Sequence, residues 1–423
     1  MTVAMAWNRK HGEPRAVVTR VFSAVVMVTA LTAGVVGHAP EAAADEAQSK
    51  QWYLEAMDAE KIWKSTTGKG IKVAIIDSGV NPNIASLKNQ VLKGADLTGT
   101  PGDETDDYSG HGTTMAELIV GTGAGGGLQG LAPGAKVIPM RVNDTDRQNK
   151  MRVNAFDVEQ AIKAAADSDA QIINVSMSND FYSSQVRDAV KYAQAKGKLL
   201  FAGAGNGAEE GNKPQYPASY PEAISVAAGG SDGQIAPYSQ HNKYVDLAAP
   251  GSDIPGWCNA SFKSYCDAGG TSNATALASA SAALIWSAHP EWTGNQVLRV
   301  MLESAGRGGD GNKKGLSEYY GYGVVRPGAH INRGLGKPGD PNVNPLTNER
   351  VGDSSDSSAS PKPSAPASSQ PPKPKPGSNA AVKGSSSESS DGSGQLGLVL
   401  GAIAAAVVIG GGAFAVVRKR RSA

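Results

Sequence analysis

The sequence predicts an α/β protein with a mostly parallel β-sheet and helices on both faces of that sheet. Short apolar runs, each bounded by Gly, Pro, Asn or Asp, have the length and composition of buried strands. Segments whose apolar residues recur at helical spacing lie between these runs. Continuous apolar strands that alternate with helices are typical of a parallel sheet covered on both faces. Sites in such sheets lie beyond the carboxyl ends of the strands, so residues at strand ends are the first candidates for function.

The predicted strands and helices fall in the middle of the 423-residue chain. The strands are Ile71–Asp77, Ala135–Val142, Gln171–Met177, Gly197–Gly205 and Ala223–Ala228. Two helices are predicted between them, at Val153–Ser168 and Tyr182–Gly197, and the second ends on a glycine. Two further helices begin near His111 and Ser272.

Composition excludes several classes of protein. Glycine accounts for 52 of the 423 residues, about 12% against a usual ~7%, but it has no three-residue period, which excludes collagen. The formal net charge of +1 gives no electrostatic reason to expect a nucleic acid as the partner. Having only two cysteines excludes a disulfide-framework miniprotein and a four-cysteine zinc site.

Residues 1–44 have the order of a secretory signal peptide. A basic start is followed by the uncharged stretch Val21–Gly37 and then by Ala42–Ala44, where we expect cleavage. A transmembrane helix that is retained is the alternative. Residues 45–68 form a short N-terminal extension whose aromatic residues are expected to pack on the protein body. An extension that also shielded a functional cleft would be inhibitory, whereas plain surface packing is the simpler interpretation.

The C-terminal end predicts a tethered membrane anchor. Residues 336–395 are rich in Ser, Pro, Gly and Lys, lack the apolar surface of a folded core, and are expected to form a disordered linker. Leu396–Val417 is uncharged and, at ~1.5 Å per residue, long enough to cross a bilayer core of ~30 Å. The basic tail 418–423 should stay cytoplasmic, which places the rest of the chain outside. A buried core helix is the alternative for the apolar stretch.

Three residues at element ends are candidates for catalysis. Asp77 closes an apolar strand, His111 begins a helix between two glycines, and Ser272 opens an Ala-rich helix after Gly269–Gly270. Each has an ordinary structural explanation by itself, as a turn or capping carboxylate, a structural histidine or a helix N-cap. Together, Asp, His and Ser in this chain order match one known order of the serine-nucleophile triad. Asn206 ends another strand and is expected to aim its amide at the developing oxyanion.

From about Gly68 to Leu335 the sequence resembles the subtilisin-like serine proteases. The resemblance rests on seven blocks in the family's order, namely VAIIDSGV around Asp77, SGHGTTMA around His111, INVSMS, AGN, YPASYPEAISVAA, GGTSNATA around Ser272, and GYGVVRPGAHI. It implies that residues 69–335 are a peptidase domain with the subtilisin-like fold and that the substrate is a polypeptide.

The resemblance also implies a role for each matching residue. Asp77 would orient His111, and His111 would take the proton of Ser272 as that serine attacks the scissile carbonyl. Asn206 and the backbone N–H of Ser272 would form the oxyanion hole. The edge that binds an extended substrate in the family corresponds to Ser176, Met177 and Ser178.

The sequence departs from the family's pattern at three positions. Asn273 and Ala276 stand where the family usually has an apolar residue and a proline, and Ser178 stands where it commonly has glycine. The intact triad supports a membrane-anchored, extracytoplasmic serine endopeptidase. The departures keep a second hypothesis open, in which the domain is catalytically weak or inactive and serves as a structural component of a membrane secretion complex.

The order of segments resembles that of the mycosins, the membrane-anchored subtilisin-like proteases associated with type VII secretion in actinobacteria. This resemblance implies the secretion machinery as a partner and a single-pass location in the cell membrane, with the catalytic domain outside. Outside the cytoplasm, Cys258 and Cys266 are expected to form a disulfide.

No cofactor or metal ligand is assigned from the sequence. Calcium binding is left as an open alternative, because the acidic loop GDETDDYSG at Gly102–Gly110 is a candidate ligand set. Such loops are more often only solvated. Gly121, Gly123 and Gly126 fit the pattern G-x-G-x-x-G. They follow a predicted helix and precede a predicted strand, the reverse of the dinucleotide-binding context, so we expect a plain loop there.

Overall fold

The sheet is the frame of the fold. The computed structural model describes residues 47–142, 155–306 and 316–350, which contain a seven-stranded sheet in the order β2-β3-β1-β4-β5-β6-β7. Neighbouring strands in this sheet pair in parallel. The strands are β1 (Lys72–Asp77), β2 (Ala95–Asp96), β3 (Lys136–Arg141), β4 (Ile172–Val175), β5 (Leu199–Gly203), β6 (Ile224–Gly229) and β7 (Leu247–Pro250). The predicted parallel sheet is confirmed, and all five predicted strands are present.

Strands β2 and β7 are not predicted by the sequence. Strand β2 has only two residues, and β7 has the sequence LAAP, which contains no β-branched or aromatic side chain. Pairing with β6 defines β7, in register from Val226 opposite Leu247 to Gly229 opposite Pro250. These strands therefore form because they pair with neighbouring strands in the sheet. The strand propensity of their own residues does not predict this pairing.

Helices follow most of the strands. The described helices are α3 (Trp52–Ala56), α4 (Ala59–Trp63), α5 (His111–Val120), α7 (Ala155–Asp167), α8 (Ser184–Ala195), α9 (Thr271–Ala288), α10 (Gly294–Ser304) and α11 (Pro327–Ile331), with 3-10 turns η1 (Ala85–Leu87), η2 (Ala124–Gly126) and η3 (Ala208–Glu210). Helices α7 and α8 lie inside the predicted ranges. Helix α8 starts after Ser183, because the Ser183 hydroxyl accepts the Val186 N–H at 3.3 Å and caps the first turn.

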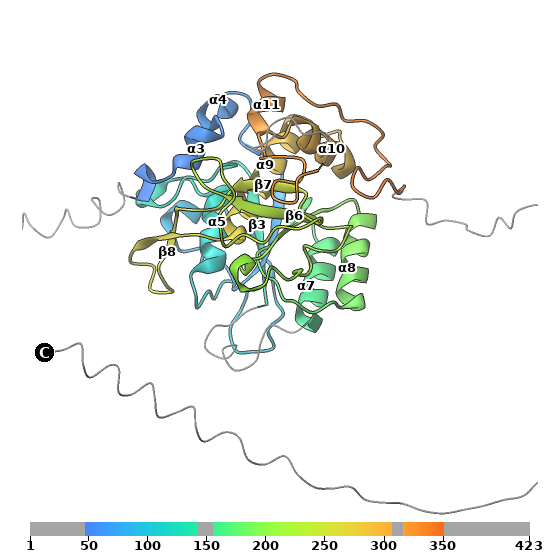
Figure 1. Cartoon of the computed structure of the whole chain (residues 1–423). Helices are drawn as coiled ribbons and strands as arrows, with labels where there is room; N and C mark the ends of the chain where they lie inside the picture. Colours follow the sequence, from blue (N-terminus) through green and yellow to red (C-terminus); the bar gives the residue numbers. More distant parts are fainter. Residues whose placement is uncertain (1–46, 143–154, 307–315, 351–423) are drawn as a thin grey trace, which may run out of the picture. The chain divides into compact units, whose positions relative to one another are not determined.

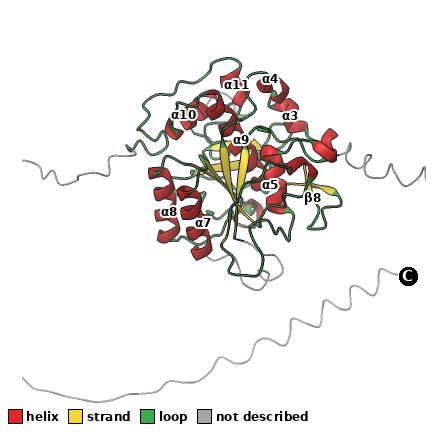
Figure 2. Ribbon diagram, turned by 180° about the vertical axis from the view of Figure 1, so that it is seen from behind, coloured by secondary structure: helices red, strands yellow, loops and turns green. Residues whose placement is uncertain are grey.

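Two apolar cores cover the two faces of the sheet. Successive strand residues point to opposite faces, and in β1 Val73 and Ile75 join one core while Ala74 and Ile76 join the other. The first core includes residues of α5, α9 and α10, and the second includes residues of α7 and α8. Figures 1 and 2 show α7 and α8 on one side of the sheet, away from α5. Helices therefore cover both faces, as predicted.

Helix α9 lies at the centre of the first core. From Thr271 to Trp286 every residue of this helix is buried except Ser272. Its small Ala and Ser side chains let the helix axis lie close to β4, β5, β6 and β7, against which it packs. The first turn of the helix therefore comes to the carboxyl ends of these strands, and Ser272 is the residue there that keeps solvent access.

The described part of the N-terminal extension packs on the body, as expected. Tyr53 is fully buried, and Trp52, Leu54 and Trp63 pack against the first core. Gln48 fastens the extension to the glycine-rich loop after α5, because its side-chain amide donates to the carbonyl oxygens of Gly123 at 2.8 Å and Gly127 at 2.7 Å. That loop follows α5 and precedes β3, so the G-x-G-x-x-G pattern lies in a connecting loop, as expected.

The predicted start of the disordered linker at residue 336 is wrong. Residues 336–350 are described, and polar groups of α10 hold their backbone. The Thr293 hydroxyl and the Asn295 amide both donate to Pro341 O, at 2.9 and 3.0 Å, and the Lys337 N–H donates to Glu303 at 2.8 Å. Composition misplaces the boundary because polar side chains around α10 hold the backbone of this segment and its single leucine, Leu346, packs against the first core.

Several predicted segments lie outside the described residues. They are the signal peptide at 1–44, the remainder of the linker at 351–395, the apolar stretch at 396–417 and the basic tail at 418–423. Among the helices that the structure does describe, none combines the length and apolarity needed to cross a membrane.

A two-stranded antiparallel ribbon precedes α9. It consists of β8 (Ile254–Trp257) and β9 (Tyr265–Ala268), and a disulfide joins Cys258 to Cys266 across its end, with the two Cα atoms 5.1 Å apart. Tyr265 of β9 donates its hydroxyl to both carboxylate oxygens of Glu117 in α5, at 2.9 and 3.0 Å. Burial raises the pKa of Glu117 to about 7, and the Tyr265 contact ties the ribbon to α5.

Candidate active site

Asp77 is the last residue of β1, near the middle of the sheet, and only 2% of its surface is exposed. Both of its carboxylate oxygens lie within hydrogen-bond distance of His111 Nδ1, at 2.7 and 2.9 Å. One of these oxygens also accepts a hydrogen bond from the Ser78 N–H at 2.7 Å. A buried carboxylate is costly without such partners. The structure therefore brings together the first two sequence-predicted catalytic residues, which are 34 positions apart in the chain.

His111 is the first residue of α5, and two glycines determine its position. Gly110, the residue before the helix, has a φ of +83°, a conformation that favours glycine. A side chain at Gly112 would clash with the carbonyl oxygen of Gly79 and place its Cβ 3.2 Å from that of Asp77. The start of α5 can approach the loop after β1 only because glycine occupies this position.

A second buried carboxylate, Asp107, organises the start of α5, and the sequence does not single it out. One of its oxygens accepts the Ser78 hydroxyl at 2.9 Å and the Gly110 N–H at 2.8 Å. The other accepts both the N–H and the hydroxyl of Thr113, at 2.9 and 2.6 Å. Asp107 thus satisfies free N–H groups at the positive end of α5. Its place in an acidic loop just before a predicted helix is the signal that could have identified it.

The ionisation of His111 depends on both carboxylates. Burial by itself would lower the pKa of His111, but the charge of Asp77, the hydrogen bond to Asp77 and the charge of Asp107 outweigh it, so the pKa lies above its usual 6.5. In the neutral ring, a proton on Nδ1 is donated to Asp77, which leaves Nε2 as an acceptor. The His111 side chain is 43% exposed, so Nε2 can meet a substrate.

Ser272 lies in the first turn of α9, after Gly270. Its hydroxyl donates to the carbonyl oxygen of Ser176 at 3.3 Å. Among the described residues it has no hydrogen bond to His111. Nucleophile–base hydrogen bonds are often long or unformed in enzymes without substrate, and a rotation about one side-chain bond moves a serine hydroxyl between such acceptors.

Asn206, three residues after β5, is held in one orientation by Thr271. Its Oδ1 accepts the Thr271 N–H at 2.9 Å and the Thr271 hydroxyl at 3.1 Å. Its Nδ2 therefore points away from Thr271. A Cβ placed on Gly270 would lie 3.6 Å from Nδ2 and 3.8 Å from the Ser272 backbone nitrogen. Both nitrogens thus lie beside the space over Gly270, which is the arrangement an oxyanion hole requires.

Ser176, Met177 and Ser178 follow β4 and become progressively more exposed along the chain, from buried to half-buried to exposed. The side-chain amide of Asn174 donates to the Ser176 hydroxyl at 2.8 Å, and Asn174 in turn accepts the hydroxyl of Ser279 at 3.2 Å. The start of this edge is therefore fixed to α9, the helix that carries Ser272.

The polar residue after Ser272 is accommodated in the fold. Asn273 is 4% exposed, and its amide donates to the carbonyl oxygens of Gly251 at 3.5 Å and Ala268 at 3.4 Å. These contacts join the start of α9 to the end of β9. Ala276 is fully buried, in a helix that continues through its position without interruption. Neither departure displaces Ser272 from the first turn of α9.

Two carboxylates of the acidic loop before His111 accept hydrogen bonds from within the loop. Asp103 accepts the N–H and the hydroxyl of Thr105, and Asp106 accepts the Asp103 N–H. Within residues 47–142, 155–306 and 316–350, no cluster of three or more His, Cys, Asp or Glu side chains is arranged to hold a metal.

The described part of the N-terminal extension leaves His111 accessible. Its side-chain hydrogen bonds reach the loop after α5, the Ser252 carbonyl and Asp267, while the His111 ring stays 43% exposed. These contacts agree with surface packing of the described segment.

The chain is similar in sequence and in structure to serine proteases of one family. A sequence model described as the subtilase family matches residues 68–323. The minor extracellular protease Epr of Bacillus subtilis is 30% identical over 280 residues, which cover 66% of this chain but 41% of that protein. Thermitase of Thermoactinomyces vulgaris is 33% identical over 231 residues, 54% of this chain and 78% of that protein. Among solved structures, the MycP3 protease from the type VII (ESX-3) secretion system matches with a TM-score of 0.58 and 28% identity, over 66% of this chain and 88% of that one.

The role of Asp107 can be tested through the ionisation of His111. Because the Asp107 charge raises the pKa of His111, Asp107→Asn should lower it and move the acid limb of a serine-labelling reaction to lower pH. The variant should also react several-fold more slowly at its optimum, because an asparagine cannot accept hydrogen bonds on both sides. The measurement is the pH dependence of the labelling rate with a fluorophosphonate.

Asp103→Asn is the matched control, since Asp103 lies in the same loop and contacts Thr105 instead of the helix start. It should leave the acid limb in place. An unchanged limb in Asp107→Asn, or one moved to higher pH, would show that Asp107 does not act on His111.

Proposed function

The chain belongs to the subtilase family of serine proteases, and on that premise we propose that Asp77, His111 and Ser272 are its catalytic triad. The observation that carries the proposal is the contact of His111 Nδ1 with Asp77 at 2.7 Å, at the end of β1. This strand end lies beside the end of β4, where the Ser272 hydroxyl donates to Ser176 O. Asp77 holds the imidazole with Nε2 free, His111 acts as general base, and Ser272 acts as nucleophile.

In the proposed reaction the Ser272 hydroxyl turns from Ser176 O towards His111 Nε2. As His111 takes its proton, Ser272 Oγ attacks the scissile carbonyl, and the new oxyanion accepts hydrogen bonds from Asn206 Nδ2 and the Ser272 N–H. His111 then passes the proton to the leaving amine as the peptide bond breaks. Water, activated by the same histidine, hydrolyses the acyl-enzyme and restores Ser272.

The substrate of this reaction is a polypeptide in extended form. Its acyl part would lie along Ser176–Ser178, where backbone groups after β4 can pair with it as an added strand. Because Ser178 is larger than the glycine common in the family, it would narrow the entrance to the first specificity pocket. The start of the edge is fixed to α9 through Asn174 and Ser279, so the scissile carbonyl would be presented to Ser272 in one register.

We further propose that the enzyme is a single-pass membrane protein that works outside the cytoplasm beside a type VII secretion system. Two observations support this. The apolar stretch 396–417 is followed by a basic tail, and similar solved structures include proteases of type VII secretion systems. The alternative role is that of a structural component with a weak or idle triad, and it rests on the departures from the family's pattern at Asn273, Ala276 and Ser178.

Labelling with a fluorophosphonate separates the enzyme from the structural component. Wild-type protein should be labelled at one serine, and Ser272→Ala should abolish labelling because the nucleophile is gone. Ser287→Ala, at the other end of α9, is the control and should be labelled normally. Failure of the folded wild-type chain to react would favour the structural role, whereas normal labelling of Ser272→Ala would identify a different nucleophile.

The membrane anchor can be tested by truncation. A chain that ends at residue 395 should move from the membrane fraction to the soluble fraction after cell lysis, because it lacks the apolar stretch. A chain that keeps 396–423 but lacks 361–390 of the linker should stay with the membrane. Retention of the first variant in the membrane would place the anchor elsewhere. A fluorophosphonate that cannot cross membranes should label Ser272 in intact cells.

A further inference from the structure

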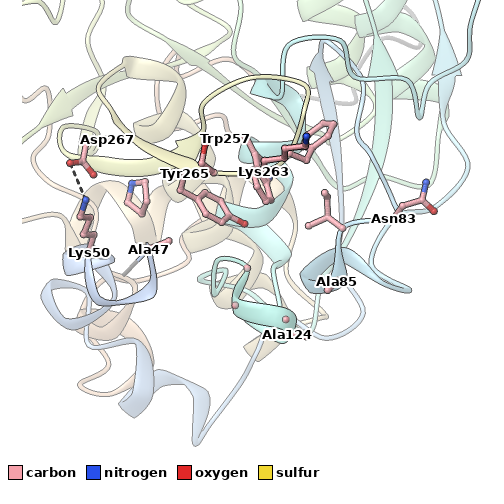
Figure 3. Close-up of a pocket in the computed structure, with 16 residues that line it drawn as sticks. Ala47, Lys50, Asn83, Ala85, Ala124, Trp257, Lys263, Tyr265 and Asp267 are labelled. Carbon is pink, nitrogen blue, oxygen red and sulfur yellow. Dashed lines mark hydrogen bonds and ion pairs between the residues drawn. The ribbon is translucent and has the colours of Figure 1, made fainter. Parts of the chain in front are cut away.

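A pocket of about 490 Å³ lies beside the ribbon, outside the triad. Figure 3 shows Trp257, Lys263 and Tyr265 of the ribbon region on one wall and Asn83 and Ala85 on the facing wall, with Ala124 of the glycine-rich loop below. The described N-terminal extension closes one end through Ala47 and Lys50. No step of the proposed catalytic mechanism uses this pocket.

Aromatic rings form a fixed wall of the pocket. The Trp257 and Tyr265 rings stack with centroids 4.0 Å apart, and Phe262 meets Trp257 edge-on at 5.5 Å. The Tyr265 hydroxyl is hydrogen-bonded to the buried Glu117 carboxylate, and this contact holds the Tyr265 ring in place on the pocket wall. Because these side chains are already ordered, a ligand ring or apolar side chain can stack on them at little cost in conformational entropy.

The other walls suit a polypeptide. Gly125 and Gly126 offer backbone without side chains, so an extended chain can approach closely. At the rim, Lys50 pairs with Asp267 at 3.4 Å, while exposed Lys263 has no acidic partner among the described residues. The charged groups that line the pocket therefore sum to one positive charge, which complements one acidic side chain.

The pocket adjoins His111 through the first turn of α5. A Cβ placed on Gly110 would lie 3.0 Å from Trp257 Cβ. The backbone N–H of Trp257 donates to the hydroxyl of Thr114, in the first turn of α5, at 3.0 Å. Since consecutive Cα atoms are about 3.8 Å apart, Trp257 Cβ lies within about 8 Å of the His111 Cα. On the facing wall, Asn83 follows Asn81, whose N–H donates to Thr113.

The direction of proton transfer decides which half of a substrate reaches this pocket. The acyl half stays on Ser272 and would lie along Ser176–Ser178. The leaving half carries the amine that His111 must protonate, so it has to pass beside His111. An extended chain advances about 3.3 Å per residue, so about three residues of the leaving half are enough to reach Trp257 from beside His111.

We propose that this pocket binds the leaving half of the polypeptide substrate, roughly three to five residues after the cleaved bond. It takes an aromatic side chain against Trp257 and Tyr265, with an acidic residue next to it at Lys263. This inference rests on the proposed function and adds a specificity that the triad and the edge at Ser176–Ser178 do not supply.

Cleavage of a randomised peptide library by the full-length chain, with products identified by mass spectrometry, tests the proposal. Sites cut by the wild type should be enriched about five- to tenfold in an aromatic and an acidic residue three to five positions after the cut, a factor that matches one stacking contact and one exposed ion pair. Lys263→Glu should convert the acidic preference into a basic one and leave residues before the cut unchanged. Lys243→Glu, an exposed lysine outside the pocket, is the matched control.

A binding measurement keeps the pocket testable without cleavage. The peptide amide Ala-Ala-Phe-Glu-Ala should bind the Ser272→Ala chain. Adding Lys263→Glu to the protein, or replacing the Phe of the peptide by Ala, should raise the Kd about fivefold or more. Equal Kd values in both comparisons, or a library with no enrichment after the cut, would overturn the pocket assignment while leaving the protease proposal intact. Absence of both cleavage and fluorophosphonate labelling would refute the protease proposal instead.

Discussion

The hydrogen bond between buried Asp77 and His111 is the interaction on which the geometry of the candidate site depends. A carboxylate that ends a central strand loses its water, so it must find a donor within the protein. The donor comes from the start of α5, which can approach only because glycine stands at position 112. Once this pair forms, the loop after β1 and the first turn of α5 are fixed against each other, and the imidazole has one orientation.

Other elements join this pair through small residues and short polar side chains. Helix α9 lies close to the sheet because its Ala and Ser side chains are small, and its first turn carries Ser272 and holds Asn206 through Thr271. Asp107 caps α5 and adds a second negative charge near the imidazole. The site is therefore assembled from strand ends and helix starts, where backbone donors and charge are available.

Sequence reasoning reached the strands and the candidate triad because their signals are local. Apolar runs predict β1, β3, β4, β5 and β6, and polar residues at strand ends and helix starts mark Asp77, Asn206, His111 and Ser272. It missed Asp107, because the contact that ties this carboxylate to the loop after β1 comes from Ser78, 29 positions away in the chain. It also placed the linker boundary too early, because polar groups around α10 hold the backbone of residues 336–350 and Leu346 packs against the first core.

Nitrogen NMR of the full-length protein across a pH titration measures the ionisation of the His111 imidazole and so tests its pairing with Asp77 most directly. We predict that the neutral ring carries its proton on Nδ1, facing Asp77, and that the pKa of His111 lies above its usual 6.5 and falls when Asp77 is replaced by asparagine. A proton on Nε2 of the neutral ring, or a pKa that does not respond to Asp77→Asn, would contradict it.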